Sequence, residues 1–256
     1  MSDTTAAPPA TRWPAALAIR NRTAAVLLGV FGLLAVVNLV GGAATASTDG
    51  VRLSDVFTKP LLMLALAGFV VAASRPSRLT NADWAPLRQA PRPSRLAVGG
   101  LLLGGVGDAA LLGHGTWFLV GMGAFALGHA CYLTAFLRRG AAATLRRRWW
   151  IPVGYLAVWA GLIVLVWPGL DGGLRVPVLV YSLLLTAMAA TAAGTGRVAG
   201  IGGALFLVSD GTLALGMADV DFPGRGAVVM PTYLTAQLLI ALALLPAAPE
   251  RGSVAA

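Results

Sequence analysis

The chain has 256 residues, of which 57% are hydrophobic and 11% are charged, and its mean hydropathy is +0.79. A soluble domain carries about 25% charged residues, so this composition excludes a water-soluble enzyme. The net charge of +9 would suggest nucleic acid in a soluble protein. Here the basic residues lie between apolar runs, where they set membrane topology, and we expect no nucleic-acid partner. Cys131 is the only cysteine, which excludes a cysteine metal site, and no metal or cofactor is indicated.

Apolar runs bounded by charge, proline or glycine follow one another along the chain. They lie at 24–43, 57–73, 96–113, 116–137, 150–167, 175–193, 198–217 and 227–246. A helix needs roughly 20 apolar residues to cross a hydrocarbon core of about 30 Å, so each run spans or nearly spans a bilayer. The sequence therefore predicts an all-α, polytopic membrane domain at 24–246, a bundle of eight transmembrane helices.

The segments outside these runs are expected to lack regular structure. Residues 1–23 form an Ala/Pro-rich tail that should be disordered, and residues 247–256 form a short second tail. Segment 74–95 is rich in proline and should be an irregular loop.

Positively charged residues concentrate on one side of the predicted helices. Fifteen Lys and Arg residues fall on the side of the two tails, against four on the opposite side. The positive-inside rule then places both termini in the cytoplasm, with the helices in the cell inner membrane. The alternative is a signal peptide cleaved near Ala44-Thr45-Ala46, but the polar tail before the first run is long for such a peptide.

Two aspartates lie in similar local sequences. Asp108 and Asp210 each follow a small residue and precede a leucine at the third position. Both predicted helices that carry them run from the inner to the outer side. This pattern fits an internal duplication with a parallel four-plus-four repeat, although helix composition alone produces similar matches.

Asp108 and Asp210 are also the carboxylates that fall well inside predicted helices. An aspartate at the centre of a membrane helix raises the free energy of insertion by about 2.5–3.5 kcal/mol. Two such residues therefore indicate a specific role. Asp108 lies thirteen residues from Arg95, and Asp210 lies thirteen from Arg197. At a rise of about 1.5 Å per residue, both lie ~20 Å above the inner boundary. Two carboxyls at one depth in a low dielectric cannot both ionise cheaply, so the pair can supply an acid and a base.

Other polar residues fall near the same level. Tyr233 comes to the same height as the aspartates, and Asn38 and Lys59 lie about one turn further out. Lys59 either binds a phosphate or carboxyl group or extends to the membrane interface. Alternatively, the aspartates have a structural role, in which each caps a helix irregularity or pairs with Lys59.

His129 and Gln237 fall lower, ~13 Å above the inner boundary, where they are expected to form the floor of the same cavity. Tyr132 lies one turn from His129 on the same helix face. A lone intramembrane histidine is, however, more often an interhelical hydrogen-bond partner than a catalyst.

Five short segments contain most of these polar residues: Thr58–Met63, Gly107–Leu112, His129–Tyr132, Phe206–Asp210, and Thr232–Tyr233 with Gln237. In this order and spacing they resemble the YhhN family of eight-helix membrane proteins, which includes the lysoplasmalogenases, over about residues 24–246. The resemblance implies hydrolysis of the vinyl ether bond of a lysoplasmalogen to a fatty aldehyde and a glycerophospho-base. It also implies that Asp108 and Asp210 correspond to the family's pair of intramembrane aspartates.

On this resemblance the remaining residues form the substrate-binding set. Tyr233, Asn38 and Gln237 would orient water or lipid oxygens, and Lys59 would pair with the lipid phosphate. His129, Tyr132 and Ser209 complete the set. The expected partners are therefore a lysophospholipid substrate and membrane lipid.

Two other functions remain open at this stage. The same acids would serve a small-solute or proton-coupled transporter, and a non-catalytic lipid-binding protein would bind a lysolipid without turnover. The sequence leaves open the lipid headgroup, the leaflet of entry, the oligomeric state, and which aspartate is the acid.

Overall fold

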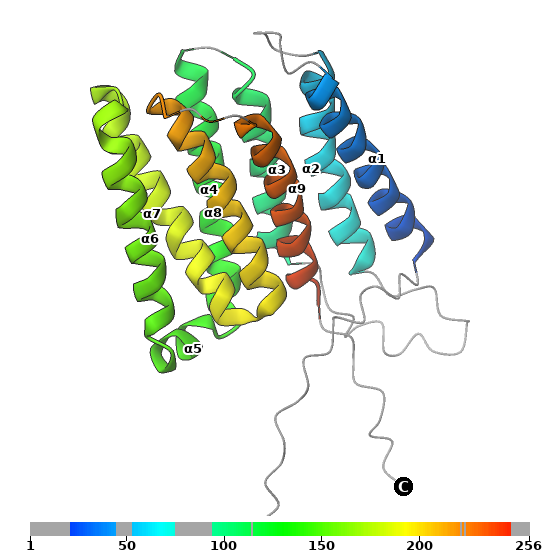
Figure 1. The fold of residues 1–256 in the computed structure, drawn as a ribbon. Helices are drawn as coiled ribbons and strands as arrows, with labels where there is room; N and C mark the ends of the chain where they lie inside the picture. Colours follow the sequence, from blue (N-terminus) through cyan, green and yellow to red (C-terminus); the bar gives the residue numbers. More distant parts are fainter. Residues whose placement is uncertain are drawn as a thin grey trace, which may run out of the picture.

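The computed structural model describes residues 21–44, 53–74, 94–113, 115–220, 222 and 224–246. These residues form α-helices and one 3-10 helix, with no strand among them (Figure 1). The elements are α1 (Arg22–Ala44), α2 (Leu53–Ala73), α3 (Arg95–Ala110), α4 (Thr116–Arg138), α5 (Ala141–Arg147), α6 (Trp150–Val166), η3 (Trp167–Gly169), α7 (Gly172–Thr195), α8 (Arg197–Met217) and α9 (Arg225–Ala243). The described part of the chain is therefore all-α, as its apolar runs predict. The expected tails at 1–23 and 247–256 and the loop at 74–95 lie mostly outside the described residues.

Every predicted apolar run is helical, but the segment between the fourth and fifth runs is not a plain loop. It contains α5, a helix of 7 residues preceded by Gly140 in a left-handed conformation. Alanine and arginine are strong helix formers, which explains why Ala141–Arg147 folds in this way. A helix this short shows no clear hydrophobic period, so the sequence pattern did not reveal it.

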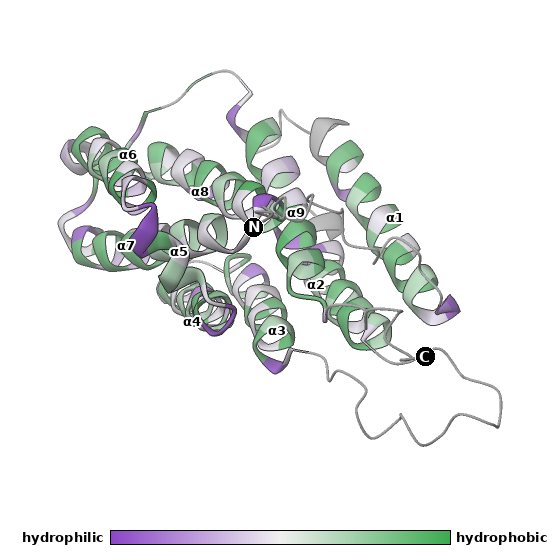
Figure 2. Ribbon diagram, turned by 90° about the horizontal axis from the view of Figure 1, so that it is seen from below, coloured by the Kyte–Doolittle hydropathy of each residue, from purple (hydrophilic) through white to green (hydrophobic). Residues whose placement is uncertain are grey.

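Apolar side chains cover the outside of the bundle. Figure 2 shows that hydrophobic residues predominate along the helices, and large apolar side chains such as Leu33 and Val164 are 66% and 74% exposed. Five helices, α1, α4, α6 with η3, α7 and α8, are long and apolar enough to cross a membrane. The apolar parts of α2 and α9 are shorter, at Thr58–Ala73 and Ala227–Ala243. An apolar exterior of this kind is suited to lipid rather than water.

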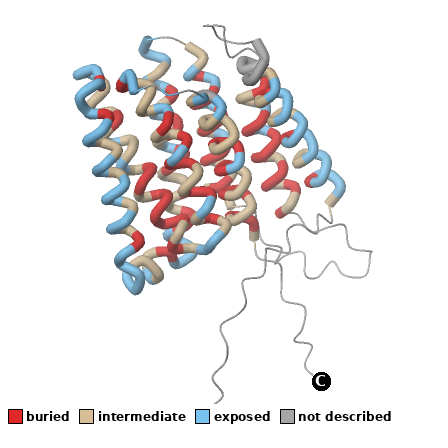
Figure 3. Tube along the Cα trace, in the orientation of Figure 1, coloured by how far each residue is buried: buried red, intermediate tan, exposed pale blue. Residues whose placement is uncertain are grey.

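The buried residues lie along the middle helices of the bundle, while the outer faces of α1 and α6 are exposed at its two edges (Figure 3). Neighbouring helices pack as α3 on α4, α8 on α9, and α7 on both α4 and α8. Gly203 permits the close contact of α8 with α7, because a Cβ there would lie 2.9 Å from Ala189 Cα. The central position of α3, α8 and α9 places their polar residues in the interior.

Arg139, just after α4, connects the end of this helix to the end of α9 through hydrogen bonds. Its guanidinium donates to the carbonyl oxygens of Ala243, Leu244 (2.7 Å) and Leu245 (3.1 Å). The last carbonyls of a helix have no partner within the helix and carry partial negative charge, so a cation there is stabilising.

Replacing Arg139 with Ala is expected to lower the melting temperature by about 2–4 °C, because three helix-terminal carbonyls lose their donor. The measurement is thermal unfolding of the purified protein in detergent, with Arg138→Ala as the matched control. Arg138 is exposed at the last position of α4. Equal melting temperatures for the two variants would contradict a stabilising role for Arg139.

Candidate active site

A cavity of about 230 Å³ lies inside the bundle, bordered by side chains from α2, α3, α4, α6, α7, α8 and α9. Its polar lining residues are Lys59, Asp108, Tyr181, Ser182, Ser209, Asp210 and Tyr233. The rest of the lining is apolar or small, apart from the Trp159 indole N–H, which donates to Ser182 Oγ (3.0 Å). Two carboxyl groups thus share one cavity whose lining is otherwise mostly apolar.

Asp108 heads a chain of hydrogen bonds that joins three helices. Its side chain is buried on α3, and Oδ2 accepts a hydrogen bond from the Tyr233 hydroxyl of α9 (2.8 Å). Gln237 Nε2 donates to the Tyr233 oxygen (3.3 Å), and Gln237 Oε1 accepts from the Tyr132 hydroxyl of α4 (2.8 Å). A Cβ at Gly104 would lie 3.0 Å from Gln237 Nε2, so glycine leaves room for this chain. The chain holds Tyr233 in place and directs its proton to Asp108.

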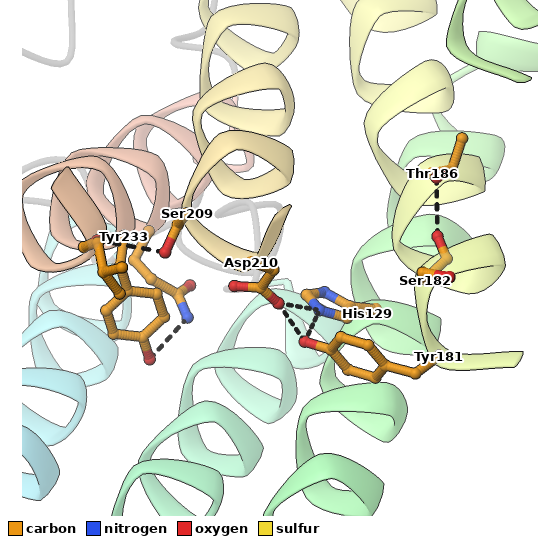
Figure 4. Close-up of polar contacts among 9 residues, drawn as sticks. His129, Tyr181, Ser182, Thr186, Ser209, Asp210 and Tyr233 are labelled. Atoms are coloured by element: carbon orange, nitrogen blue, oxygen red, sulfur yellow. Dashed lines mark hydrogen bonds and ion pairs between the residues drawn. The ribbon is translucent and has the colours of Figure 1, made fainter. Parts of the chain in front are cut away.

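Asp210 has an equivalent partner on α7. The Tyr181 hydroxyl donates to Asp210 Oδ2, and His129 Nε2 lies 3.1 Å from the Tyr181 oxygen and 4.0 Å from Oδ2 (Figure 4). A tyrosine hydroxyl has one proton, and Tyr181 uses it in the hydrogen bond to Asp210. In the contact between His129 and Tyr181, His129 Nε2 is therefore the donor and the Tyr181 oxygen is the acceptor. His129 Nδ1 is then the unprotonated nitrogen, and it is buried with no hydrogen-bond partner among the described residues.

Phe206 lies between the two hydrogen-bonded groups. Its ring packs edge-on against His129 and Tyr233, with centroid distances of 4.7 and 5.5 Å. The Phe206 ring therefore contacts one member of each hydrogen-bonded group.

Lys59 lines the same cavity as the Asp108 carboxyl. Asn38, on α1, donates to Thr58 Oγ1 (2.8 Å), the residue before Lys59. Ser209 lines the cavity beside Asp210 and donates to the Val229 carbonyl of α9 (3.2 Å). Both hydrogen bonds therefore join helices next to cavity residues.

The structure brings five of the sequence-derived site residues to the cavity wall. These are Lys59, Asp108, Ser209, Asp210 and Tyr233. The other four, Asn38, His129, Tyr132 and Gln237, do not line it. His129 and Gln237, which are expected at the cavity floor, instead hydrogen-bond to Tyr181 and Tyr233, which line it.

Tyr181 is the site residue that sequence reasoning missed. It lies sixteen residues before Arg197, ~24 Å above the inner boundary and within one turn of the level of Asp210. The same depth calculation that selected Tyr233 would have found it.

The tyrosine pairing gives no support to the four-plus-four repeat. In such a repeat α3 would be equivalent to α8, so the partners of Asp108 and Asp210 should come from equivalent helices. They come from α9 and α7, the eighth and sixth long helices, which are not equivalent. The repeat stays a prediction.

Comparison with known proteins shows the family to which the chain belongs. The model of the YhhN family matches residues 54–244, about three quarters of the chain. The chain belongs to the YhhN family. With this membership and its long apolar helices, it is an integral membrane protein. No solved structure matches it.

Several relatives of this YhhN family member carry the name lysoplasmalogenase. The human Lysoplasmalogenase TMEM86B is 32% identical over 198 residues, which cover 73% of this chain and 74% of the human protein. The Lysoplasmalogenase of Mycobacterium bovis is 35% identical over 157 residues, covering 58% of this chain and 60% of the relative. The bovine Lysoplasmalogenase TMEM86A is 33% identical over 170 residues, covering 59% and 65%.

Proposed function

We propose that this chain is a membrane-embedded lysoplasmalogenase that hydrolyses the vinyl ether bond of a lysoplasmalogen. The observation that carries the proposal is the pair of carboxyls, Asp108 and Asp210, each accepting a tyrosine hydrogen bond at the wall of one largely apolar cavity. The names of the relatives support the same substrate class.

Vinyl ether hydrolysis needs one proton donor and one base. Protonation of the β-carbon gives an oxocarbenium ion, and water then adds to the α-carbon to form a hemiacetal. The hemiacetal loses its hydroxyl proton as the ether oxygen takes one, which releases the aldehyde and the glycerol hydroxyl. Each carboxyl therefore changes its protonation state twice and ends as it began.

We assign the first proton to Asp210 and the base to Asp108. Asp108 shares the cavity wall with the Lys59 ammonium of the neighbouring helix α2, which suits the carboxylate form that a base needs. Asp210 adjoins the apolar lining residues Leu207 and Gly211, beside which the β-carbon of a hydrocarbon chain would lie. Asp210 Oδ2 is occupied by Tyr181, so Oδ1 is the oxygen that carries the transferred proton.

The neighbouring residues act on this pair in different ways. Tyr181 and Tyr233 hold the two carboxyls, while His129, Gln237 and Tyr132 hold the tyrosines. Ser209 and Lys59 contact the substrate, with Lys59 facing the lipid phosphate. Asn38 acts through Thr58, keeping this part of α2 against α1.

We further propose that each of the eight longer helices, α1–α4 and α6–α9, spans the bilayer. Both termini lie in the cytoplasm and the membrane is the cell inner membrane, as the distribution of positive charge supports. The aspartates then lie in the outer half of the bilayer.

The test is aldehyde release by the purified protein from three lysolipids that differ only at the first chain linkage: vinyl ether, saturated ether and ester. Aldehyde from the vinyl ether alone is the expected result. No aldehyde with intact lysolipid binding would contradict the proposal in favour of a binding protein. Solute flux in vesicles without aldehyde release would contradict it in favour of a transporter.

A further inference from the structure

Gly211 is a glycine that neither backbone conformation nor helix packing explains. It lies in the interior of α8, where glycine is less favourable than alanine, and its φ is not positive. Gly203 of the same helix is explained by the Ala189 backbone 2.9 Å from its would-be Cβ. At Gly211 a Cβ would meet only side-chain carbons of Leu162, at 3.4 and 3.8 Å, so a methyl group fits. Gly211 lines the cavity beside Asp210. Because it has no side chain, it leaves space in the cavity.

The cavity continues from Gly211 along α8 in an apolar path. Ala214 and Met217 continue the lining on α8, opposite Ile163 and Val166 of α6. Val166 also belongs to a small buried cluster near the ends of α6 and α8, with Leu170, Val178 and Ala218. Gly211 and Met217 are six residues apart, so this path is about 9 Å long.

The cavity also reaches the outside of the bundle. Leu213 lines it and is 43% exposed, on the apolar exterior. A volume of about 230 Å³ is below the roughly 300–1,000 Å³ of pockets that enclose drug-sized ligands. The cavity therefore holds part of one chain, and the remainder lies against the bilayer.

We propose that the apolar space between α6, α7 and α8 binds the first part of a single unbranched hydrocarbon chain, and that Gly211 sets its width. This proposal says which part of the substrate the site binds, so it rests on the function proposed above. It places the chain atoms nearest the headgroup beside Asp210, with the distal part toward Leu213 and the lipid.

The experiment compares Gly211→Ala and Gly211→Leu with Gly161→Leu as the matched control. A Cβ at Gly161 meets nothing within 4 Å, and this glycine of α6 does not line the cavity. The first readout is binding of a saturated-ether lysophosphatidylcholine with a hexadecyl chain, measured by native mass spectrometry. The second is kcat/KM for vinyl-ether lysolipids with long and short chains.

Each displaced methylene is expected to weaken binding about fourfold, so Gly211→Ala should lose about fourfold and Gly211→Leu at least about tenfold. The kcat/KM for long-chain and short-chain lysolipids should fall in parallel with binding, because the first part of either chain lies beside Gly211. Adding Leu162→Ala to Gly211→Leu should recover part of the loss, because Leu162 is the side chain that the new leucine meets. Thermal unfolding of each variant separates loss of binding from loss of fold, and Gly211→Ala tests the proposal if the larger variant does not fold.

Long-chain binding within twofold of wild type in the Gly211 variants would overturn the chain site, as would an equal loss in Gly161→Leu. If the saturated-ether probe binds in a Gly211-dependent manner but wild type releases no aldehyde, the chain site stands and the hydrolase function fails.

Discussion

Asp210→Asn is expected to lower kcat/KM for lysoplasmalogen hydrolysis by about 10³-fold, within the range that general acid–base groups contribute. Asparagine has nearly the same shape and still accepts from Tyr181, but it has no acidic proton for the β-carbon. Asp108→Asn should cause a loss of similar size, because water addition then lacks its base. The measurement is aldehyde release at saturating and limiting substrate.

The matched control is Asp171→Asn, the same chemical change at an exposed residue before α7. It should retain wild-type activity within about twofold, the range expected of a surface change. Binding of the saturated-ether lysolipid checks that the two active-site variants remain folded. Near-normal turnover by either of them would contradict the dyad mechanism.

Tyr181→Phe is expected to lower kcat by about 10- to 100-fold with a smaller change in KM. The variant removes the hydrogen bond to Asp210 and leaves His129 Nε2 without its tyrosine partner. As Asp210 gives up its proton, the Tyr181 hydroxyl becomes a donor to a charged carboxylate. Such a hydrogen bond is worth about 1.5–3 kcal/mol, which corresponds to this change in rate. Steady-state kinetics of the purified variant give the two constants.

Tyr155→Phe is the control for this change, since Tyr155 lies on α6 away from the cavity lining. It should keep wild-type kcat. A loss in Tyr181→Phe that appears only in KM would assign the hydroxyl to substrate binding and contradict its role in holding Asp210.

The apolar runs were sufficient to predict the helices, because a membrane helix must satisfy its backbone internally and face hydrocarbon. They did not reveal α5, whose seven residues are too few to show a period. Counting residues from Arg95 and Arg197 predicts one common level for Asp108 and Asp210, and both line one cavity. Spacing along the chain thus predicted that the two residues share a level.

Rotation about the helix axis was much harder to predict. Apolar residues are distributed almost evenly around α3 and α6, so the pattern does not tell which face turns inward. His129 on α4 and Gln237 on α9 are expected at the cavity floor from their depth alone, whereas they hydrogen-bond to Tyr181 and Tyr233, which line the cavity. The pairing of Asp210 with Tyr181 depends on how α7 packs on α8, which spacing along the chain does not contain.

Hydrolysis of a lysoplasmalogen in water enriched in oxygen-18 tests the proposed mechanism most directly. If water adds to the α-carbon of an oxocarbenium ion, the bond that breaks joins that carbon to the ether oxygen. The glycerophospho-base, analysed by mass spectrometry, should then carry no heavy oxygen, and the released aldehyde should carry it. Heavy oxygen in the glycerophospho-base would show attack at the glycerol carbon and contradict carbon protonation by the Asp108 and Asp210 pair.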